Sequence, residues 1–141
     1  MSQPPSPEDF NTKIIREFRG NGGKVGGPFE GAPILLLTST GAKSGLERVN
    51  PMMYLPDGGR LIVFASKAGA PTNPDWYHNL VAHAAATAEV GAERFGVTAT
   101  VITGAERDEL YARQASIYPG FAEYEAKTTR TIPVIALDRT A

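Results

Sequence analysis

The sequence predicts an α+β fold that is mainly β, a small antiparallel barrel of about six strands with about three helices packed outside it. Apolar segments of strand length are frequent, and turn signals rich in Gly and Pro separate them. Helical periodicity is confined to three segments, which do not alternate regularly with the strands. A doubly wound parallel sheet needs that alternation, so the sequence disfavours it.

The first 32 residues are predicted to form a helix and a Gly-rich loop that precede a barrel domain at 33–141. Ser6 can cap the helix, Pro7 suits its first position, and the glycines from Gly20 onward end it. Large apolar residues at helical spacing form one stripe: Phe10, Ile14, Ile15 and Phe18. We expect this stripe to pack on the barrel, and a mobile lid or a surface anchor is the alternative.

Strands at 34–39, 48–55 and 60–65 are predicted to form an antiparallel meander. The first begins with a continuous apolar run, which is typical of a strand buried on both faces. The sequence Pro-Asp-Gly-Gly at 56–59 indicates a hairpin between the second and the third.

The second half of the chain adds two helices and three strands. Asn73 is expected to cap the first of these helices, with Pro74 in its first turn, and Thr103 to cap the second. In chain order the predicted elements are a short helix from 74, a hairpin of 87–90 and 95–102, a helix over 104–117, one further turn over 121–125, and a strand at 132–137.

Composition indicates a soluble, single-domain, cytoplasmic protein, with peripheral contact to a membrane left open. Fourteen Lys and Arg face fifteen Asp and Glu, so no basic field gathers nucleic acid, and we expect no nucleic-acid partner. The absence of cysteine excludes a disulfide scaffold, a thiolate zinc site and a cysteine nucleophile. The apolar run at 34–37 is far shorter than the roughly 20 residues that span a bilayer, so stable membrane insertion is not expected.

A polar segment after the first strand carries the clearest chemical signal. It holds hydroxyls, two glycines, Lys43 and Arg48. Glycines let backbone N–H groups approach an anion, and the cations supply charge. The segment is not a nucleotide phosphate loop, because Leu37 and Ala42 stand where that loop needs glycine. Anion binding and a plain polar hairpin turn are both open for this segment taken alone.

Two further segments resemble ligand-binding loops. Residues 65–70 again place small residues around one cation, Lys67, at the end of a strand. Residues 73–80 contain the aromatic pair Trp76 and Tyr77, and the alternative is that this pair only packs in the core. Together the segments favour one ligand with phosphate or carboxylate groups and a flat body. His78 and His83 lie five residues apart with no carboxylate in register, so we expect no metal site.

Five motifs in series resemble the deazaflavin-dependent nitroreductase family. They read T-G-x-K-S-G-x-x-R-x-N-P from 40, A-S-K-x-G-A from 65, N-P-x-W-Y-x-N-L from 73, Y-P-G-F-A-x-Y from 118 and T-x-R-x-I-P-V from 128. The family consists of small reductases that use coenzyme F420, an 8-hydroxy-5-deazaflavin with a glutamate tail, on a split β-barrel. The resemblance therefore implies a split barrel and F420 as cofactor.

The resemblance also implies roles for individual residues. Tyr118 and Tyr124 would line the substrate side, where a hydroxyl orients the acceptor or relays a proton. Arg130 would be either a structural cation or a contact to the cofactor tail. The implied cofactor-binding residues are Lys43, Ser44, Arg48, Asn50, Pro51, Ser66, Lys67, Ala68, Gly69, Trp76, Tyr77 and Asn79.

The expected activity is hydride transfer from reduced F420 to a small activated acceptor, namely a conjugated enone or lactone, a quinone or a nitro-aromatic. Ala42, Met53 and Phe121 depart from the family pattern by removing a base, a ring and a hydroxyl, which puts reduction of bulky bicyclic nitro compounds in doubt. The alternatives are an FMN-dependent flavin reductase of the same barrel class and a deazaflavin-binding protein without turnover. A homodimer is left open.

Overall fold

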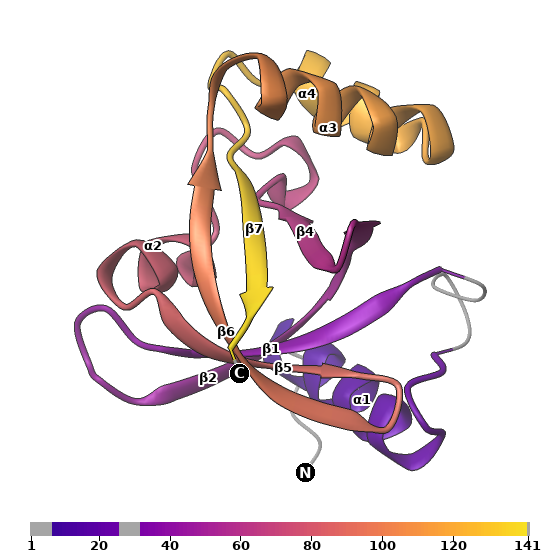
Figure 1. Cartoon of the computed structure of the whole chain (residues 1–141), viewed down its shortest axis with the longest axis vertical. Coiled ribbons are helices and arrows are strands. Elements are labelled where there is room, and N and C mark those ends of the chain that lie inside the picture. The colour runs from indigo at the N-terminus through magenta and orange to yellow at the C-terminus, as the bar shows by residue number, and fades with distance from the viewer. Residues whose placement is uncertain (1–6, 26–31, 141) are drawn as a thin grey trace, which may run out of the picture.

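In the computed structural model, which describes residues 7–25 and 32–140, one curled antiparallel sheet forms the body of the protein (Figure 1). The described part of the chain contributes seven strands to this sheet, in the order β2-β1-β5-β6-β7-β4-β3. The expected mainly β, antiparallel barrel with outer helices is confirmed. The strands are β1 (Ile34–Thr40), β2 (Glu47–Met53), β3 (Leu55–Asp57), β4 (Arg60–Phe64), β5 (Ala85–Val90), β6 (Glu93–Ile102) and β7 (Val134–Arg139).

The predicted meander of the first three strands is wrong. The segment expected as one strand at 48–55 is broken at Tyr54 into β2 and β3, and these lie at opposite edges of the sheet. β4 pairs with β3 and with β7, whereas β2 pairs with β1. The sheet curls enough for one residue to connect its two edges, and this leaves the barrel split between β2 and β3.

β1 has apolar side chains on both faces of the sheet, as its sequence predicts. Leu35 and Leu37 lie in one core cluster with residues of β4, β6 and β7. Ile34 and Leu36 point into another cluster, beneath the first helix. All four side chains are buried, so β1 separates two parts of the core.

The N-terminal helix α1 (Pro7–Gly20) packs against the sheet. Ile14 and Phe18 are buried against Ile34 and Leu36, and Arg19 forms two hydrogen bonds, of 3.1 and 2.8 Å, with the Glu89 carboxylate. The packing expected for the apolar stripe is therefore confirmed at these positions. The Ser6 cap and the Phe10 side chain lie outside the described residues.

The other helical elements are α2 (Asp75–Ala82), α3 (Gly104–Ile117), α4 (Gly120–Lys127) and the 3₁₀ turn η2 (Lys67–Gly69). Figure 1 shows α3 and α4 side by side at one end of the sheet, above β4. No helix in residues 7–25 and 32–140 is long and apolar enough to cross a membrane.

Neither of the two predicted helix caps forms a side-chain capping hydrogen bond. Thr103 stands at the N-cap of α3, but its hydroxyl makes no capping bond. Pro74 stands at the N-cap of α2, and the carboxamide of Asn73 instead accepts a hydrogen bond from Arg130. The single turn expected over 121–125 is the eight-residue helix α4.

Candidate functional site

A cleft of about 890 Å³ lies between α1, the turn that joins β1 to β2, and α2. Most of its lining is polar or charged. The lining residues are Thr12, Ile15, Gly41, Ala42, Lys43, Ser44, Glu47, Arg48, Val49, Asn50, Asp75, His78 and Asn79. The cleft therefore gathers the first polar segment of the sequence and one face of the third.

The turn at 41–46 has a closely packed backbone. The Gly41 N–H donates to the Leu46 carbonyl at 2.8 Å, and the Gly45 N–H donates to the Gly41 carbonyl at 2.9 Å. Gly45 adopts a φ of 70°, which favours glycine, and a Cβ on Gly41 would lie 2.5 Å from Ser44 Oγ and 3.2 Å from the Leu46 carbonyl oxygen, so it would displace the Ser44 side chain. These constraints fix the turn that carries Lys43 and Ser44.

Asn79 of α2 holds this turn from the far side of the cleft. Its Oδ1 accepts a hydrogen bond from the Ala42 N–H at 2.9 Å, and its Nδ2 donates to Ser39 Oγ at 3.4 Å. Asn79 is buried, and both of its polar atoms are thereby engaged. It acts in this structure as a brace of the cleft wall.

The charges on the cleft have both signs. Lys43 and Arg48 are exposed, and neither forms an ion pair with any residue of 7–25 or 32–140. Glu47 and Asp75 also line the cleft and oppose binding of an anion close to them. The arrangement suits a ligand whose negative groups reach the two cations while an uncharged part passes the carboxylates.

The second predicted segment forms a separate turn after β4. Ser66 is buried, and η2 closes with hydrogen bonds from the Gly69 N–H to the Ser66 carbonyl and from the Ala70 N–H to the Lys67 carbonyl. Lys67 adopts a φ of 47°, in the left-handed region, which costs a non-glycine residue about 1 kcal/mol or more. Its Nζ donates to Thr72 Oγ1 at 3.2 Å.

The two predicted substrate-side tyrosines pack on the core beneath α3 and α4. Tyr118 and Tyr124 are half-buried against a cluster that contains Phe64 and Phe121, and Met53 packs on the same cluster. The rings of Phe121 and Tyr124 meet edge to face at 5.3 Å. Aromatic and apolar surface around hydroxyls is typical of a pocket for a flat organic molecule.

The structure brings together some of the predicted residues and separates others. Lys43, Ser44, Arg48, Asn50 and Asn79 share the cleft. Gly69 contacts α4 at Tyr124, so the second segment adjoins the predicted substrate side. The lining of the cleft does not include Pro51, Ser66, Lys67, Ala68, Gly69, Trp76 or Tyr77. Trp76 and Tyr77 are half-buried on the core cluster of β1 and β7, as their core alternative predicts.

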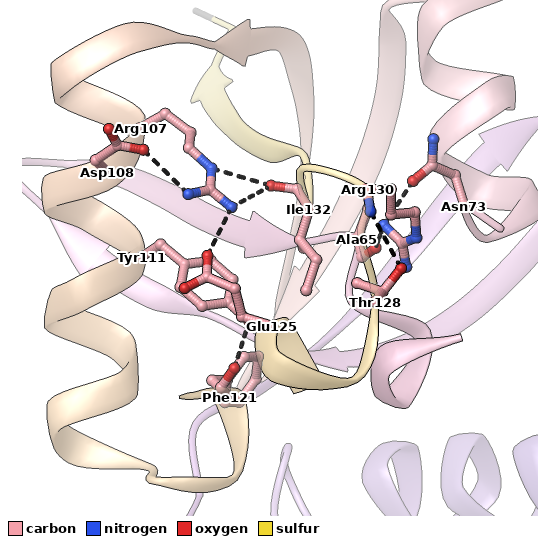
Figure 2. A network of polar contacts seen from close by, with 10 residues as sticks. All are labelled: Ala65, Asn73, Arg107, Asp108, Tyr111, Phe121, Glu125, Thr128, Arg130 and Ile132. Atoms are coloured by element: carbon pink, nitrogen blue, oxygen red, sulfur yellow. Dashed lines mark hydrogen bonds and ion pairs between the residues drawn. The ribbon is translucent and has the colours of Figure 1, made fainter. Parts of the chain in front are cut away.

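Arg130, for which two roles were open, makes structural contacts. Its guanidinium donates to the carbonyls of Ala65, Ser66 and Ala70 at 3.1, 2.8 and 2.9 Å, and to Asn73 Oδ1 at 2.7 Å. Figure 2 shows it beside Ala65 and Asn73. Burial lowers the pKa of this guanidinium from its usual value.

A second arginine, Arg107, makes buried polar contacts that were not predicted from the sequence. It is buried, donates twice to the Ile132 carbonyl, at 3.1 and 2.9 Å, and pairs with Asp108 and Glu125 (Figure 2). Below it, the Tyr111 hydroxyl donates to the Phe121 carbonyl at 2.6 Å, and burial raises the pKa of Tyr111 to about 12. An arginine in a helix is usually exposed, so nothing in the sequence marks this one as buried.

Known proteins resemble this chain over most of its length. A model of the F420H(2)-dependent quinone reductase family matches residues 11–139. An F420H(2)-dependent quinone reductase of Mycobacterium tuberculosis is 40% identical over 128 residues, which are 86% of this chain and 85% of that protein. A second protein of the same species is also described as an F420H(2)-dependent quinone reductase. It is 38% identical over 105 residues, which are 74% of this chain and 88% of that protein.

Solved structures also resemble this chain. An F420-H2 dependent reductase (FDR-A) has a TM-score of 0.69 at 38% identity and covers 75% of this chain and 94% of its own. A structure described as a domain-swapped dimer has a TM-score of 0.71 at 36% identity and covers 94% of this chain and all of its own. The Vibrio cholerae haem storage protein HutZ, at 12% identity and a TM-score of 0.61, shares the fold alone. The chain thus belongs to the F420H2-dependent quinone reductase family.

Proposed function

We propose that this protein is an F420H2-dependent reductase that passes a hydride to a quinone. The observation that carries the proposal is the cleft at the β1–β2 turn, where Lys43 and Arg48 stand without ion-pair partners among the described residues. Membership of the quinone reductase family supplies the cofactor and the class of reaction.

The residues of the structure fit this cofactor. F420 carries a phosphate and carboxylates on a long polar arm, and the cleft offers two exposed cations, the Ser44 hydroxyl and the Asn50 carboxamide. Lys67 has a strained backbone within a turn of otherwise small residues, and such strain is typical of ligand-binding loops. We infer that Lys43, Ser44, Arg48 and Asn50 hold the arm, and that Ser66 to Gly69 lie nearer the ring system.

The acid–base demands on the protein are small. When bound, the reduced deazaflavin supplies the hydride, so the difficult chemistry belongs to the cofactor. The protein positions the acceptor and keeps water away from it. Tyr124 packs half-buried on the same apolar cluster as Tyr118, and its hydroxyl orients an acceptor oxygen or donates the proton that the reduced oxygen needs.

The acceptor proposed first is a quinone, and enones, lactones and nitro-aromatics are the further candidates. A flat acceptor suits a position beside Met53 and Tyr124, which pack half-buried on the cluster around Phe121; of these three side chains only Tyr124 has a hydroxyl. We also propose that the protein acts in the cytoplasm. We propose further that it forms a homodimer, because one solved relative is described as a domain-swapped dimer.

The test begins with binding and proceeds to turnover. Purified protein is titrated with F420 and with FMN, and cofactor fluorescence gives each dissociation constant. Quinones, enones and nitro-aromatics are then offered with F420H2, and oxidation of the cofactor is followed by its absorbance. Saturable F420 binding with quinone-dependent oxidation supports the proposal. Tighter binding of FMN would favour the flavin reductase, and binding without oxidation by any acceptor would favour the non-catalytic binding protein.

A further inference from the structure

The turn after β4 has a conformation that its own sequence does not favour. Lys67 and Gly69 both have positive φ, at 47° and 81°, and only Gly69 can adopt such an angle without strain. Two hydrogen bonds inside the turn, of 2.9 and 3.0 Å, hold it as the short helix η2. A turn of three residues with one strained backbone needs support from outside.

Arg130 supplies that support from the segment between α4 and β7. All four hydrogen bonds of its guanidinium end on residues 65–73, and three of the acceptors are backbone carbonyls. Nε contacts Ala70 while Nη2 contacts Ser66, so the planar fork spans the start and the end of η2. A lysine carries the same charge but cannot span both carbonyls in this geometry.

The positive charge of Arg130 is also not paired with a carboxylate among the described residues. Across residues 7–25 and 32–140, no carboxylate forms an ion pair with it, whereas Arg107 contacts both Asp108 and Glu125 (Figure 2). Carbonyls and one carboxamide satisfy the donors of Arg130 without neutralising its charge. The guanidinium therefore adds a fixed positive charge directly behind the turn.

Gly69 sets how closely the turn approaches α4. A Cβ at this position would lie 2.9 Å from the Tyr124 carbonyl oxygen, 3.1 Å from Tyr124 Cα and 3.0 Å from Lys127 Cβ. Two of these atoms are helix backbone, which cannot move aside as a flexible side chain can. The position of Tyr124 relative to the turn thus depends on a residue without a side chain.

We propose that Arg130 is a positioning residue that holds η2 in its cofactor-binding conformation and, through the contact of Gly69 with α4, sets the distance between that turn and Tyr124. The inference rests on the proposed function, since it takes η2 as part of the F420 site. Arg130 acts through the turn and not by touching the cofactor.

Arg130→Lys tests the proposal, with Arg107→Lys as the matched control. Both changes keep a charge and remove a forked set of contacts, but the hydrogen bonds of Arg107 within the described residues go to Ile132, Asp108 and Glu125 and to no residue of 65–73. We expect Arg130→Lys to raise the dissociation constant for F420 about tenfold, and Arg107→Lys to lower the melting temperature while changing that constant less than twofold. An equal loss of affinity in both variants would overturn the proposal, because general destabilisation would then explain it.

Hydrogen exchange of the cofactor-free protein separates positioning from direct contact. The amides of Gly69 and Ala70 donate the bonds that close η2, so in Arg130→Lys they should exchange at least tenfold faster than in the parent. Unchanged exchange together with weaker F420 binding would show that Arg130 touches the cofactor, and would overturn the positioning role. If the parent itself does not bind F420, the proposed function fails, whereas the exchange result still reports on the turn.

Two further variants, of which Asn73→Ala is the milder, keep the test decisive if Arg130→Lys does not fold. Asn73→Ala removes only the 2.7 Å hydrogen bond to Arg130. Gly69→Ala inserts the methyl group that the Tyr124 backbone excludes. Both should weaken F420 binding, and Gly69→Ala should also raise KM for the acceptor more than it lowers kcat. Unchanged F420 affinity in both variants would contradict the proposal.

Discussion

The side-chain oxygen of Asn79 accepts a hydrogen bond of 2.9 Å from the backbone N–H of Ala42, so a helix that follows β4 holds the turn that precedes β2. This contact fixes the wall of the cleft on which Lys43 lies. Because Asn79 and Ser39 are buried, a residue without the carboxamide leaves Ser39 Oγ without this donor and the Ala42 N–H without its acceptor.

We therefore expect Asn79→Ala to lower the free energy of unfolding by about 1–3 kcal/mol and to weaken F420 binding. Asn79→Asp is the control, because it keeps an acceptor for the Ala42 N–H and loses the donor to Ser39. Chemical denaturation and F420 titration measure the two effects. A variant Asn79→Ala with parental cofactor affinity would show that the turn does not need this brace.

Lys43→Ala and Arg48→Ala should each weaken F420 binding about tenfold, since a charge-assisted contact contributes roughly 1.5–3 kcal/mol. Both side chains are exposed, so the melting temperature should stay within about 1 °C of the parent. Lys13→Ala removes an exposed lysine that does not line the cleft and serves as the control. Parental affinity in both cleft variants would rule out the anion-binding role.

The fold was largely predictable from local patterns, and the contacts between segments were not. The apolar strand β1 and the Pro-Asp-Gly-Gly turn before β4 can be predicted from the sequence because each depends on a few neighbouring residues. The break at Tyr54 cannot be predicted in this way, since it arises where the chain passes from one edge of the curled sheet to the other. Lys43 and Arg48 could be identified from residue type and spacing, whereas the contact of Asn73 with Arg130 joins segments far apart in sequence.

Tyr124→Phe should retain F420 binding and lower turnover on quinones, because it removes only a hydroxyl. The fall should reach about a hundredfold if this hydroxyl donates the proton, and much less if it only orients the acceptor. Tyr118→Phe, at the other half-buried tyrosine of the same cluster, is the comparison. Steady-state rates at saturating cofactor decide the matter, and parental rates for both variants would leave water as the proton source.

The stability of the protein should fall as pH rises from about 10 to about 12. Burial raises the pKa of Tyr111 to about 12, above the value of about 10 in an unfolded chain. The folded state thus favours the neutral phenol, whose contribution is complete below pH 10 and is lost as the pH approaches 12. Denaturation across this range, compared with Tyr111→Phe, measures the effect. A parent and a variant with the same pH dependence would contradict it.

The order of the strands also governs when this barrel can form during synthesis. β4 forms a hairpin with β3, but its only other partner in the described sheet is β7, at Val134–Arg139. Until the ribosome has released residue 139, the hairpin has no strand to join, and Phe64 lacks the cover of Val134. β1, β2, β5 and β6 can pair earlier. The nascent chain therefore exposes an unfinished sheet edge along β6, where premature association with another chain competes with completion of the fold.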